Sequence, residues 1–373
     1  SLTSWAPAVP TFLRRSLADL NGFDGGDHLA AFDAFRASAA RLLAGAFPTG
    51  SLGLRSEAFH GPAQAARDVG ELSDVAAARR FFETHFVPLA IVPENGTGFL
   101  TGYYEPVVEA SDTPDDRFRF PLYGRPDDLV AIDKVNRPPG FDPEFLYGRR
   151  LGCGMIGEYF DRAAIEASAL EGRGLEIAWL EAKVEAFFIH VQGSARLVMR
   201  DGRQVRVGYA GKTGHPFTAI GRSLVEAGEL TLAEADMAGI KAWFARNPAR
   251  VDEVLNRNRS FIFFAEIPVE DPALGPVGAA KVPLTPLASI AVDRQLATYG
   301  IPYFISSDSL SIGGEPFRRT MIAQDTGSAI IGPARADIFV GTGDAAGAIA
   351  GTIRHQAEFF VLVPRDLAGE LTQ

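Results

Sequence analysis

Two aspartates near the C-terminus lie inside short apolar runs. Asp325 follows the run 321–324, Asp337 lies within 335–340, and a Gly-Pro turn stands between the two runs. A carboxylate surrounded by Ile, Phe and Val loses contact with water, and this desolvation raises its pKa. A carboxylic acid that keeps its proton near neutral pH can act as a general acid. We therefore expect acid–base chemistry in this stretch, with Asp337 as the better candidate.

A third aspartate, Asp293, lies in the nearby sequence Ala-Val-Asp-Arg. A single aspartate in a strand more often has a structural role, such as accepting backbone N–H bonds. Three aspartates in one strand-rich segment favour a carboxylate site. Arg294 and Arg335 are equally good candidates for ion-pair partners of these carboxylates.

The spacing of apolar residues predicts the elements that must hold these acids. Residues 110–150 are rich in Pro, Asp and Gly and are predicted to form loops, and Thr231 with Glu234 forms a capping-box pattern. The predicted helices are 31–43, 74–89, 222–227 and 232–245. The predicted strands are 98–106, 187–193, 205–209, 261–264, 290–292, 303–305 and 359–363.

A long mixed segment separates the early strand near Phe99 from the late strands. This order indicates an insertion, in which the early strand pairs with the late strands and the middle forms a second domain. We predict a discontinuous domain over 1–107 and 258–373 and an inserted domain over 108–257. The interface between two domains is a common place for a ligand cleft.

The composition excludes several classes of site and partner. The 373 residues carry a net charge of -10 and no basic block with interleaved aromatics, which argues against a nucleic-acid partner and leaves a neutral or cationic polymer. Cys153 is the only cysteine, so neither an intrachain disulfide nor a cysteine-ligated metal site can form, and we expect it to be a small buried hydrophobe. The histidines lack zinc-site spacing.

Two glycine-rich stretches are weak matches to phosphate-binding motifs. The sequence from Gly341 to Ala346 fits G-x-G-x-x-A, but it lies too close to the C-terminus for a βαβαβ unit. Gly211-Lys212-Thr213 resembles the end of a P-loop, but Arg206 occupies the position of the first glycine. We reject both motifs.

Several motifs in a fixed order resemble the membrane-bound lytic murein transglycosylase A family, including its C-terminal region of three aspartates. The resemblance covers roughly residues 98–365. Its motifs are LTGYYEP at 100–106, VQGS at 191–194, GYAGKTGH at 208–215, NRSFIFF at 258–264, VPL at 282–284 and the segment that carries Asp293, Asp325 and Asp337.

This resemblance implies a fold and a set of site residues. The fold is mainly β with α+β elements: a double-psi β-barrel with N-terminal helices and a second β-rich domain inserted into it, the glycan lying in a groove between the two. Asp337 is implied as the catalytic acid, with Asp325 and Asp293 as supporting acids. The residues implied to line the groove are Thr101, Tyr103, Gln192, Tyr209 and Lys212.

The implied reaction is cleavage of the β-1,4 bond between N-acetylmuramic acid and N-acetylglucosamine in peptidoglycan, with formation of a 1,6-anhydromuramic acid end. One aspartate serves as acid and then base, and neither a metal nor an organic cofactor is needed. Two alternatives stay open: a glycoside hydrolase with Asp325 as base, and a glycan-binding protein without activity.

The resemblance also implies a place in the cell. The family is typically anchored in the outer membrane through a lipid-modified cysteine at the mature N-terminus, but the chain begins at Ser1, and Cys153 cannot serve. We expect a monomeric periplasmic protein that is either anchored through a cysteine missing from this sequence or soluble.

Overall fold

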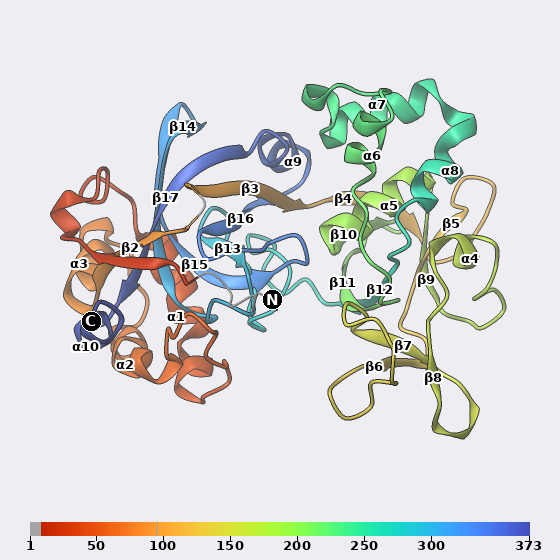
Figure 1. Cartoon of the computed structure of the whole chain (residues 1–373). Coiled ribbons are helices and arrows are strands. Elements are labelled where there is room, and N and C mark those ends of the chain that lie inside the picture. Colours follow the sequence, from red (N-terminus) through yellow and green to blue (C-terminus); the bar gives the residue numbers. More distant parts are fainter. Residues whose placement is uncertain (1–8, 95) are drawn as a thin grey trace. The chain divides into compact units, whose positions relative to one another are not determined.

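The computed structural model describes residues 9–94 and 96–373, so Ser1 lies outside the described residues. The chain divides into two compact units, one formed by Ser1–Tyr104 with Pro272–Gln373 and the other by Glu105–Asp271 (Figure 1). No helix of the described residues is long and apolar enough to cross a bilayer.

Six strands of the first unit form a closed barrel in the order β17-β14-β15-β13-β16-β3, and β3 pairs with β17 to close the ring. Closure leaves no strand edge exposed within the barrel. The predicted class, mainly β with α+β elements, is confirmed. The barrel strands are β3 (Gly98–Glu105), β13 (Ser289–Val292), β14 (Pro302–Ile312), β15 (Glu315–Thr326), β16 (Arg335–Thr342) and β17 (Arg354–Val363).

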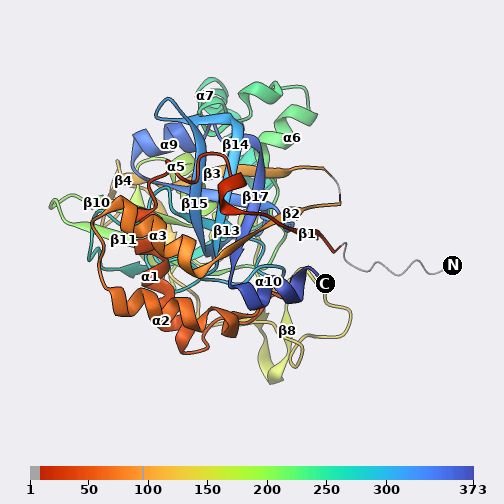
Figure 2. The same cartoon turned by 90° about the vertical axis from the view of Figure 1, so that its left-hand side faces the viewer.

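Helices cover one side of this barrel (Figure 2). Helix α1 buries a stripe that includes Phe32 and Phe35 at helical spacing. It is joined to β15 by the buried amide of Gln324, whose Nε2 donates to the Ala34 carbonyl at 2.7 Å and to Ser38 Oγ at 2.8 Å. The helices of this unit are α1 (Leu29–Leu43), α2 (His60–Val69), α3 (Val75–His85), α9 (Asp344–Ala350) and α10 (Arg365–Leu371).

The helix predicted over 74–89 is only partly correct. Asp74 caps α3 by accepting a hydrogen bond from Ala76 N at 3.1 Å, and the helix ends at His85. The next residues form strand β2 (Val87–Val92), which pairs with β17 and with the short strand β1 (Thr11–Arg14). Pairing with an existing sheet edge outweighs the helical pattern there.

The second unit contains a six-stranded sheet in the order β12-β11-β10-β4-β9-β5 and a three-stranded sheet β6-β7-β8. The prediction of loops over 110–150 is therefore wrong in part, since short strands pair within this range. The strands are β4 (Val107–Ser111), β5 (Phe120–Tyr123), β6 (Leu129–Ala131), β7 (Tyr147–Arg150), β8 (Ile156–Gly157), β9 (Glu176–Leu180), β10 (Ser194–Met199), β11 (Gln204–Lys212) and β12 (Ile262–Ile267).

The prediction of a strand over 187–193 is wrong, because helix α5 (Lys183–Gln192) occupies these residues. A short apolar run does not distinguish a strand from a buried helix. Gly193 favours a helix over a strand here, because a glycine commonly ends a helix in the left-handed conformation, and Gly193 does so with φ 83°. The other helices of this unit are α4 (Arg162–Glu166), α6 (Ile220–Glu226), α7 (Met237–Arg246) and α8 (Val251–Asn256).

The capping box predicted at Thr231 and Glu234 is present, but it starts a 3₁₀ turn rather than the helix itself. The α-helix begins later, where Asp236 accepts from Gly239 N at 2.7 Å. The expectation that Cys153 is buried is wrong: it is exposed, with φ 61° in a tight turn.

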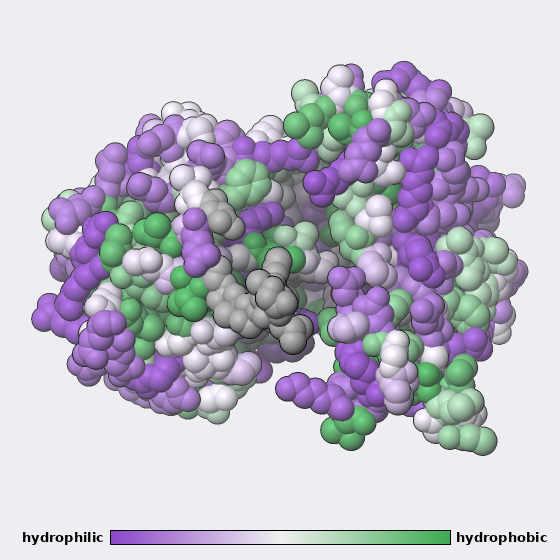
Figure 3. All heavy atoms as spheres, in the orientation of Figure 1, coloured by the Kyte–Doolittle hydropathy of each residue, from purple (hydrophilic) through white to green (hydrophobic). Residues whose placement is uncertain are grey.

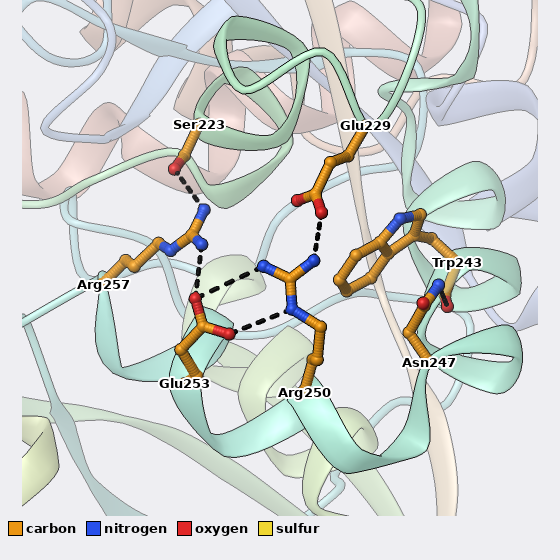
Figure 4. Close-up of polar contacts among 7 residues, drawn as sticks. All are labelled: Ser223, Glu229, Trp243, Asn247, Arg250, Glu253 and Arg257. Carbon is orange, nitrogen blue, oxygen red and sulfur yellow. Dashed lines mark hydrogen bonds and ion pairs between the residues drawn. The ribbon is translucent and has the colours of Figure 1, made fainter.

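An ion network joins the helices at one end of the second unit (Figure 4). Arg250 Nε donates to Glu253 Oε2 at 3.0 Å, and Nη1 of the same guanidinium group donates to Glu229 Oε1. Arg257 bridges Glu253 at 2.6 Å and Ser223 Oγ at 3.0 Å. The side chains of the network are partly exposed, and the face of this unit in Figure 3 carries both hydrophilic and hydrophobic residues. The contribution of the network is therefore mainly to the placement of the helices.

A buried ion triad lies in the same unit. Glu105 is fully buried, and its Oε1 accepts from Arg196 Nη2 at 2.9 Å and from Arg206 Nη2 at 3.1 Å. Arg196 and Arg206 belong to the neighbouring strands β10 and β11 and are paired in register. One carboxylate therefore compensates two buried guanidinium groups.

Candidate active site

Strand β13 aligns the two predicted acids. Ala291 on β13 is the register partner of Asp337 on the antiparallel strand β16 and of Asp325 on the parallel strand β15. Register partners in neighbouring strands project to the same face of a sheet. Asp325 and Asp337 therefore lie on one face, on the two sides of the same strand.

A β-bulge produces this alignment. The register between β13 and β15 shifts between Ile290 and Ala291, so that Gln324 is the extra residue and Asp325 takes the position opposite Ala291. Without the bulge, the alternation of the pleat would turn Asp325 to the other face.

Asp337 is held by a short hydrogen-bonded chain. Arg335 Nη1 donates to Thr101 Oγ1 at 2.9 Å, and Thr101 Oγ1 donates to Asp337 Oδ1 at 3.0 Å. A guanidinium group can only donate, so Thr101 Oγ1 accepts from Arg335 and keeps its own O–H to donate to Asp337. Among the described residues no side chain or backbone group donates to Asp337 Oδ2, which leaves this oxygen available to a ligand.

The surroundings of Asp337 favour its protonated form. Its pKa is raised to about 7, mainly by burial and to a smaller extent by the carboxylate of Asp325, while the hydrogen bond from Thr101 and the charge of Arg335 act in the opposite direction. Its strand neighbours Ala336 and Ile338 are buried, whereas Asp337 itself keeps a partly exposed face. Solvent or substrate can therefore reach an acid that is protonated near neutral pH.

Asp325 is bonded at both oxygens. Tyr103 OH donates to Oδ2 at 2.7 Å and the backbone N–H of Ala279 donates to Oδ1 at 3.0 Å. Burial raises its pKa, and these hydrogen bonds oppose the increase. Burial and the carboxylate of Asp325 raise the pKa of Tyr103 well above its usual value, so its phenol stays a donor.

The loop that carries Ala279 approaches β15 closely. A Cβ atom on Gly278 would lie 2.5 Å from the carbonyl oxygen of Gln324, so only glycine fits at this position. This close approach brings the N–H of Ala279 to Asp325. No local pattern in the sequence predicts this contact.

Arg335 is the other residue whose role was missed, since it was considered only as an ion-pair partner. Arg335 and Asp337 are two residues apart on β16, as Thr101 and Tyr103 are on β3, and residues two apart in a strand share a face. This spacing in the sequence indicates that Arg335 lies on the same face as Asp337. Tyr103 also packs against Phe339, with ring centroids 5.5 Å apart.

Asp293 has a different environment. Its Oδ2 accepts from Gly332 N at 2.9 Å and its Oδ1 from Gln295 N at 3.0 Å. These bonds tie the loop after β13 to the loop before β16, which is the structural role that is more common for such an aspartate. A contact of Asp293 with substrate stays a prediction.

The other predicted residues lie in the second unit. Gln192 ends α5, and Tyr209 and Lys212 lie on β11. Tyr209 is half exposed, and its hydroxyl donates to Tyr147 OH at 3.3 Å. Their predicted place along a glycan stays a prediction. In the described part of the chain no group of three or more His, Cys, Asp or Glu side chains is arranged to hold a metal ion.

Two family models match the chain. Residues 99–265 match the MltA specific insert domain, and residues 288–363, which carry Asp293, Asp325 and Asp337, match the 3D domain. A membrane-bound lytic murein transglycosylase from Agrobacterium tumefaciens of known crystal structure is 44% identical, with 97% of this chain and 99% of that chain covered and a TM-score of 0.89.

The chain belongs to the membrane-bound lytic murein transglycosylase A family. This confirms the predicted family and the enzyme class that its name states.

Two further members of the family show how far the similarity extends. Membrane-bound lytic murein transglycosylase A of Vibrio cholerae is 32% identical over 270 residues, 70% of this chain and 64% of the relative. The chain thus spans a little under two thirds of that relative's length. The family member from Escherichia coli crystallised with bound chitohexaose is 26% identical, covers 96% of this chain and 95% of its own, and gives a TM-score of 0.68.

Proposed function

We propose that the chain is a lytic transglycosylase that cleaves the β-1,4 bond between N-acetylmuramic acid and N-acetylglucosamine in peptidoglycan and leaves a 1,6-anhydromuramic acid end. The observation that carries the proposal is the carboxyl group of Asp337, which has a raised pKa, one oxygen held by Thr101 and the other oxygen open. Such a group has the properties of a general acid.

In the first step Asp337 Oδ2 donates its proton to the glycosidic oxygen, the bond from C1 to that oxygen breaks, and C1 becomes oxocarbenium-like. In the second step the ionised Asp337 takes the proton from the C6 hydroxyl of the same sugar, and O6 bonds to C1. Because the nucleophile is tethered to the reacting sugar, no second carboxylate is needed to activate a water.

The neighbours of Asp337 have distinct roles in this mechanism. Thr101, which Arg335 holds in place, donates to Oδ1 and so leaves Oδ2 as the oxygen that carries the acidic proton. Asp325 is a supporting acid whose charge raises the pKa of Asp337 and whose bond from Tyr103 orders the site.

The relatives support the substrate and the place in the cell. The Escherichia coli family member was crystallised with bound chitohexaose, a β-1,4-linked glycan, which supports a glycan strand as ligand here. The curated relatives are named membrane-bound, which supports a periplasmic protein associated with the envelope. We further propose that this protein acts as a monomer and that the full-length protein is lipid-anchored. We also propose that residues 1–107 with 258–373 form the catalytic domain and that residues 108–257 form the substrate domain.

A glycoside hydrolase is the second candidate, because Asp325 shares a face with Asp337 and could activate water. Mass analysis of digested sacculi separates the two reactions, since an anhydro end lacks one water relative to a reducing end. We expect anhydro ends. Reducing muramic acid ends alone would favour the hydrolase, and intact sacculi would leave only a glycan-binding protein.

Replacement of Thr101 tests the hydrogen-bonded chain. The Thr101 bond lowers the pKa of Asp337, so Thr101→Val should raise this pKa above about 7 and shift the alkaline limb of the pH–activity profile to higher pH. The rate at the optimum should fall, because the carboxyl loses an orienting contact. Thr352→Val is the control, since Thr352 is exposed and bonds only to its own helix end. An alkaline limb that stays in place would contradict the role of Thr101.

A further inference from the structure

The second unit contains a pocket that the proposed mechanism does not use. It has a volume of about 340 Å³ and is lined by residues of α4, α5, β5 and β9, among others. The ribbons of these four elements are labelled in Figure 1. The lining of the pocket combines a buried arginine and histidine with aromatic side chains and carboxylates.

Arg162 is the most informative lining residue because it is only 2% exposed. Its Nε donates to the Asn258 carbonyl at 2.9 Å and its Nη2 to the Ser260 carbonyl at 2.6 Å. The guanidinium group lies over the rings of Phe187 and Phe261, at 4.9 and 5.1 Å from their centroids. Burial lowers its pKa to about 10, so it is still charged at neutral pH.

No carboxylate of the described residues forms an ion pair with this buried cation. Glu166 also lines the pocket, but it pairs with Lys183 at 3.1 Å. A buried charge without a counter-ion is costly, and the carbonyl and aromatic contacts compensate it only in part. Nη1 carries two N–H groups for which the described chain provides no acceptor, so Arg162 can bind an anionic ligand.

His190 supplies a neutral donor to the same pocket. Its Nδ1 accepts from Arg162 Nη2 at 3.2 Å and from Ile262 N at 3.4 Å, so the ring proton belongs on Nε2. Burial and the charge of Arg162 hold its pKa well below the usual range. The ring therefore does not compete with Arg162 for an anion but can donate a hydrogen bond beside it.

The lining also carries charges of both signs away from Arg162. Arg119 and Lys183 are cationic, and Lys183 is paired with Glu166, whereas Glu171 and Glu176 have no ion-pair partner among the described residues. The partly buried rings of Phe120 and Trp179 complete the wall. The pKa of Tyr123 is raised to about 12, mainly by burial and then by the carboxylates of Glu176, Glu166 and Glu171. This agrees with an acidic side of the pocket.

We propose that this pocket binds a short peptide that presents a carboxylate to Arg162 and an amine to Glu171 and Glu176, with its apolar parts against Phe120 and Trp179. Resting on the proposed function, the peptide is a stem peptide of peptidoglycan, which carries free carboxylates and, at its diamino acid, a free amine. A neutral glycan would leave both charges unmatched, and a phosphate would be repelled by the two glutamates.

The test uses the whole chain and the tripeptide L-alanyl-D-glutamyl-diaminopimelate, with its C-terminal amide as the matched probe. Isothermal titration calorimetry and Trp179 fluorescence should show saturable binding of the tripeptide and binding of the amide weaker by about tenfold or more. Glu171→Gln should weaken tripeptide binding in the same way while cleavage of peptide-free glycan strands is unchanged. Glu226→Gln, an exposed glutamate on α6 outside the pocket, is the control.

The variant Arg162→Gln should abolish binding, but it also removes two bonds to buried carbonyls. Glu171→Gln keeps the test independent of folding because Glu171 is exposed. Absence of tripeptide binding, or equal binding of acid and amide, in a protein that cleaves sacculi would overturn the inference and leave the proposed function intact. Tripeptide binding by a protein that cleaves neither sacculi nor glycan strands would support the pocket and overturn the proposed function.

Discussion

Asp337→Asn is expected to reduce cleavage of peptidoglycan glycan strands by about 10³-fold or more, because an amide cannot donate the proton that the glycosidic oxygen needs. Glycan binding should be retained, since Asn is isosteric and can still accept the bond from Thr101. Release of soluble fragments from sacculi measures the rate, and a pull-down with insoluble sacculi measures the binding. Asp308→Asn is the control, since Asp308 is 92% exposed and lies on barrel strand β14.

The raised pKa of Asp337 should also make the activity and the stability of the wild type depend on pH. Cleavage by the wild type should fall as the pH rises through about 7, where Asp337 loses its proton. In the unfolded chain this carboxyl titrates near pH 4. Between about pH 4 and 7 the unfolded state releases a proton that the folded state keeps, so the contribution of Asp337 to stability falls over this window and is level above it.

Asp337→Asn carries no charge to bury, so it should be more stable than the wild type above pH 7 and similar to it at pH 4. Thermal unfolding of both proteins at pH 4 and pH 8 gives the comparison. A variant that retains activity, or one that is less stable than the wild type at pH 8, would contradict the role of Asp337 as a desolvated acid.

Glu105→Gln is expected to destabilise the second unit by about 3–5 kcal/mol, because it leaves two buried guanidinium groups facing an amide in place of their shared carboxylate. This is a large part of the roughly 5–15 kcal/mol that stabilises a typical domain. The shape of the side chain is kept, so the effect reports charge and not packing.

Guanidinium unfolding followed by tryptophan fluorescence measures this change, since Trp179 and Trp243 both lie in the second unit. Glu109→Gln is a matched control on adjacent strand β4. Glu109 pairs with Arg117 at 2.9 Å, but both side chains are more than 60% exposed, so the cost should be below about 1 kcal/mol. Equal midpoints for the two variants would mean that Arg196 and Arg206 are compensated without the carboxylate of Glu105.

Local sequence predicted those elements whose pattern agreed with their tertiary contacts. The helix over 31–43 is present because its apolar stripe meets the barrel, and the late strands are present because their apolar runs are buried. The run 187–193 was misread because it fits a buried helix and a buried strand equally well. Residues 87–89 continue a helical pattern, yet they pair with β17, a partner more than 260 residues away in the chain.

The sequence by itself determined the family, through ordered motifs. It also predicted Asp337 as the better acid, because an aspartate flanked by Ala, Ile and Phe in a strand is desolvated wherever that strand packs. Only the tertiary structure decided how the site is assembled. The bulge at Gln324 sets Asp325 on the face of Asp337, and the pairing of β3 with β16 brings Thr101 beside Asp337 across 236 positions of sequence. Strand register and loop approach are set by pairing between distant segments, which no local pattern encodes.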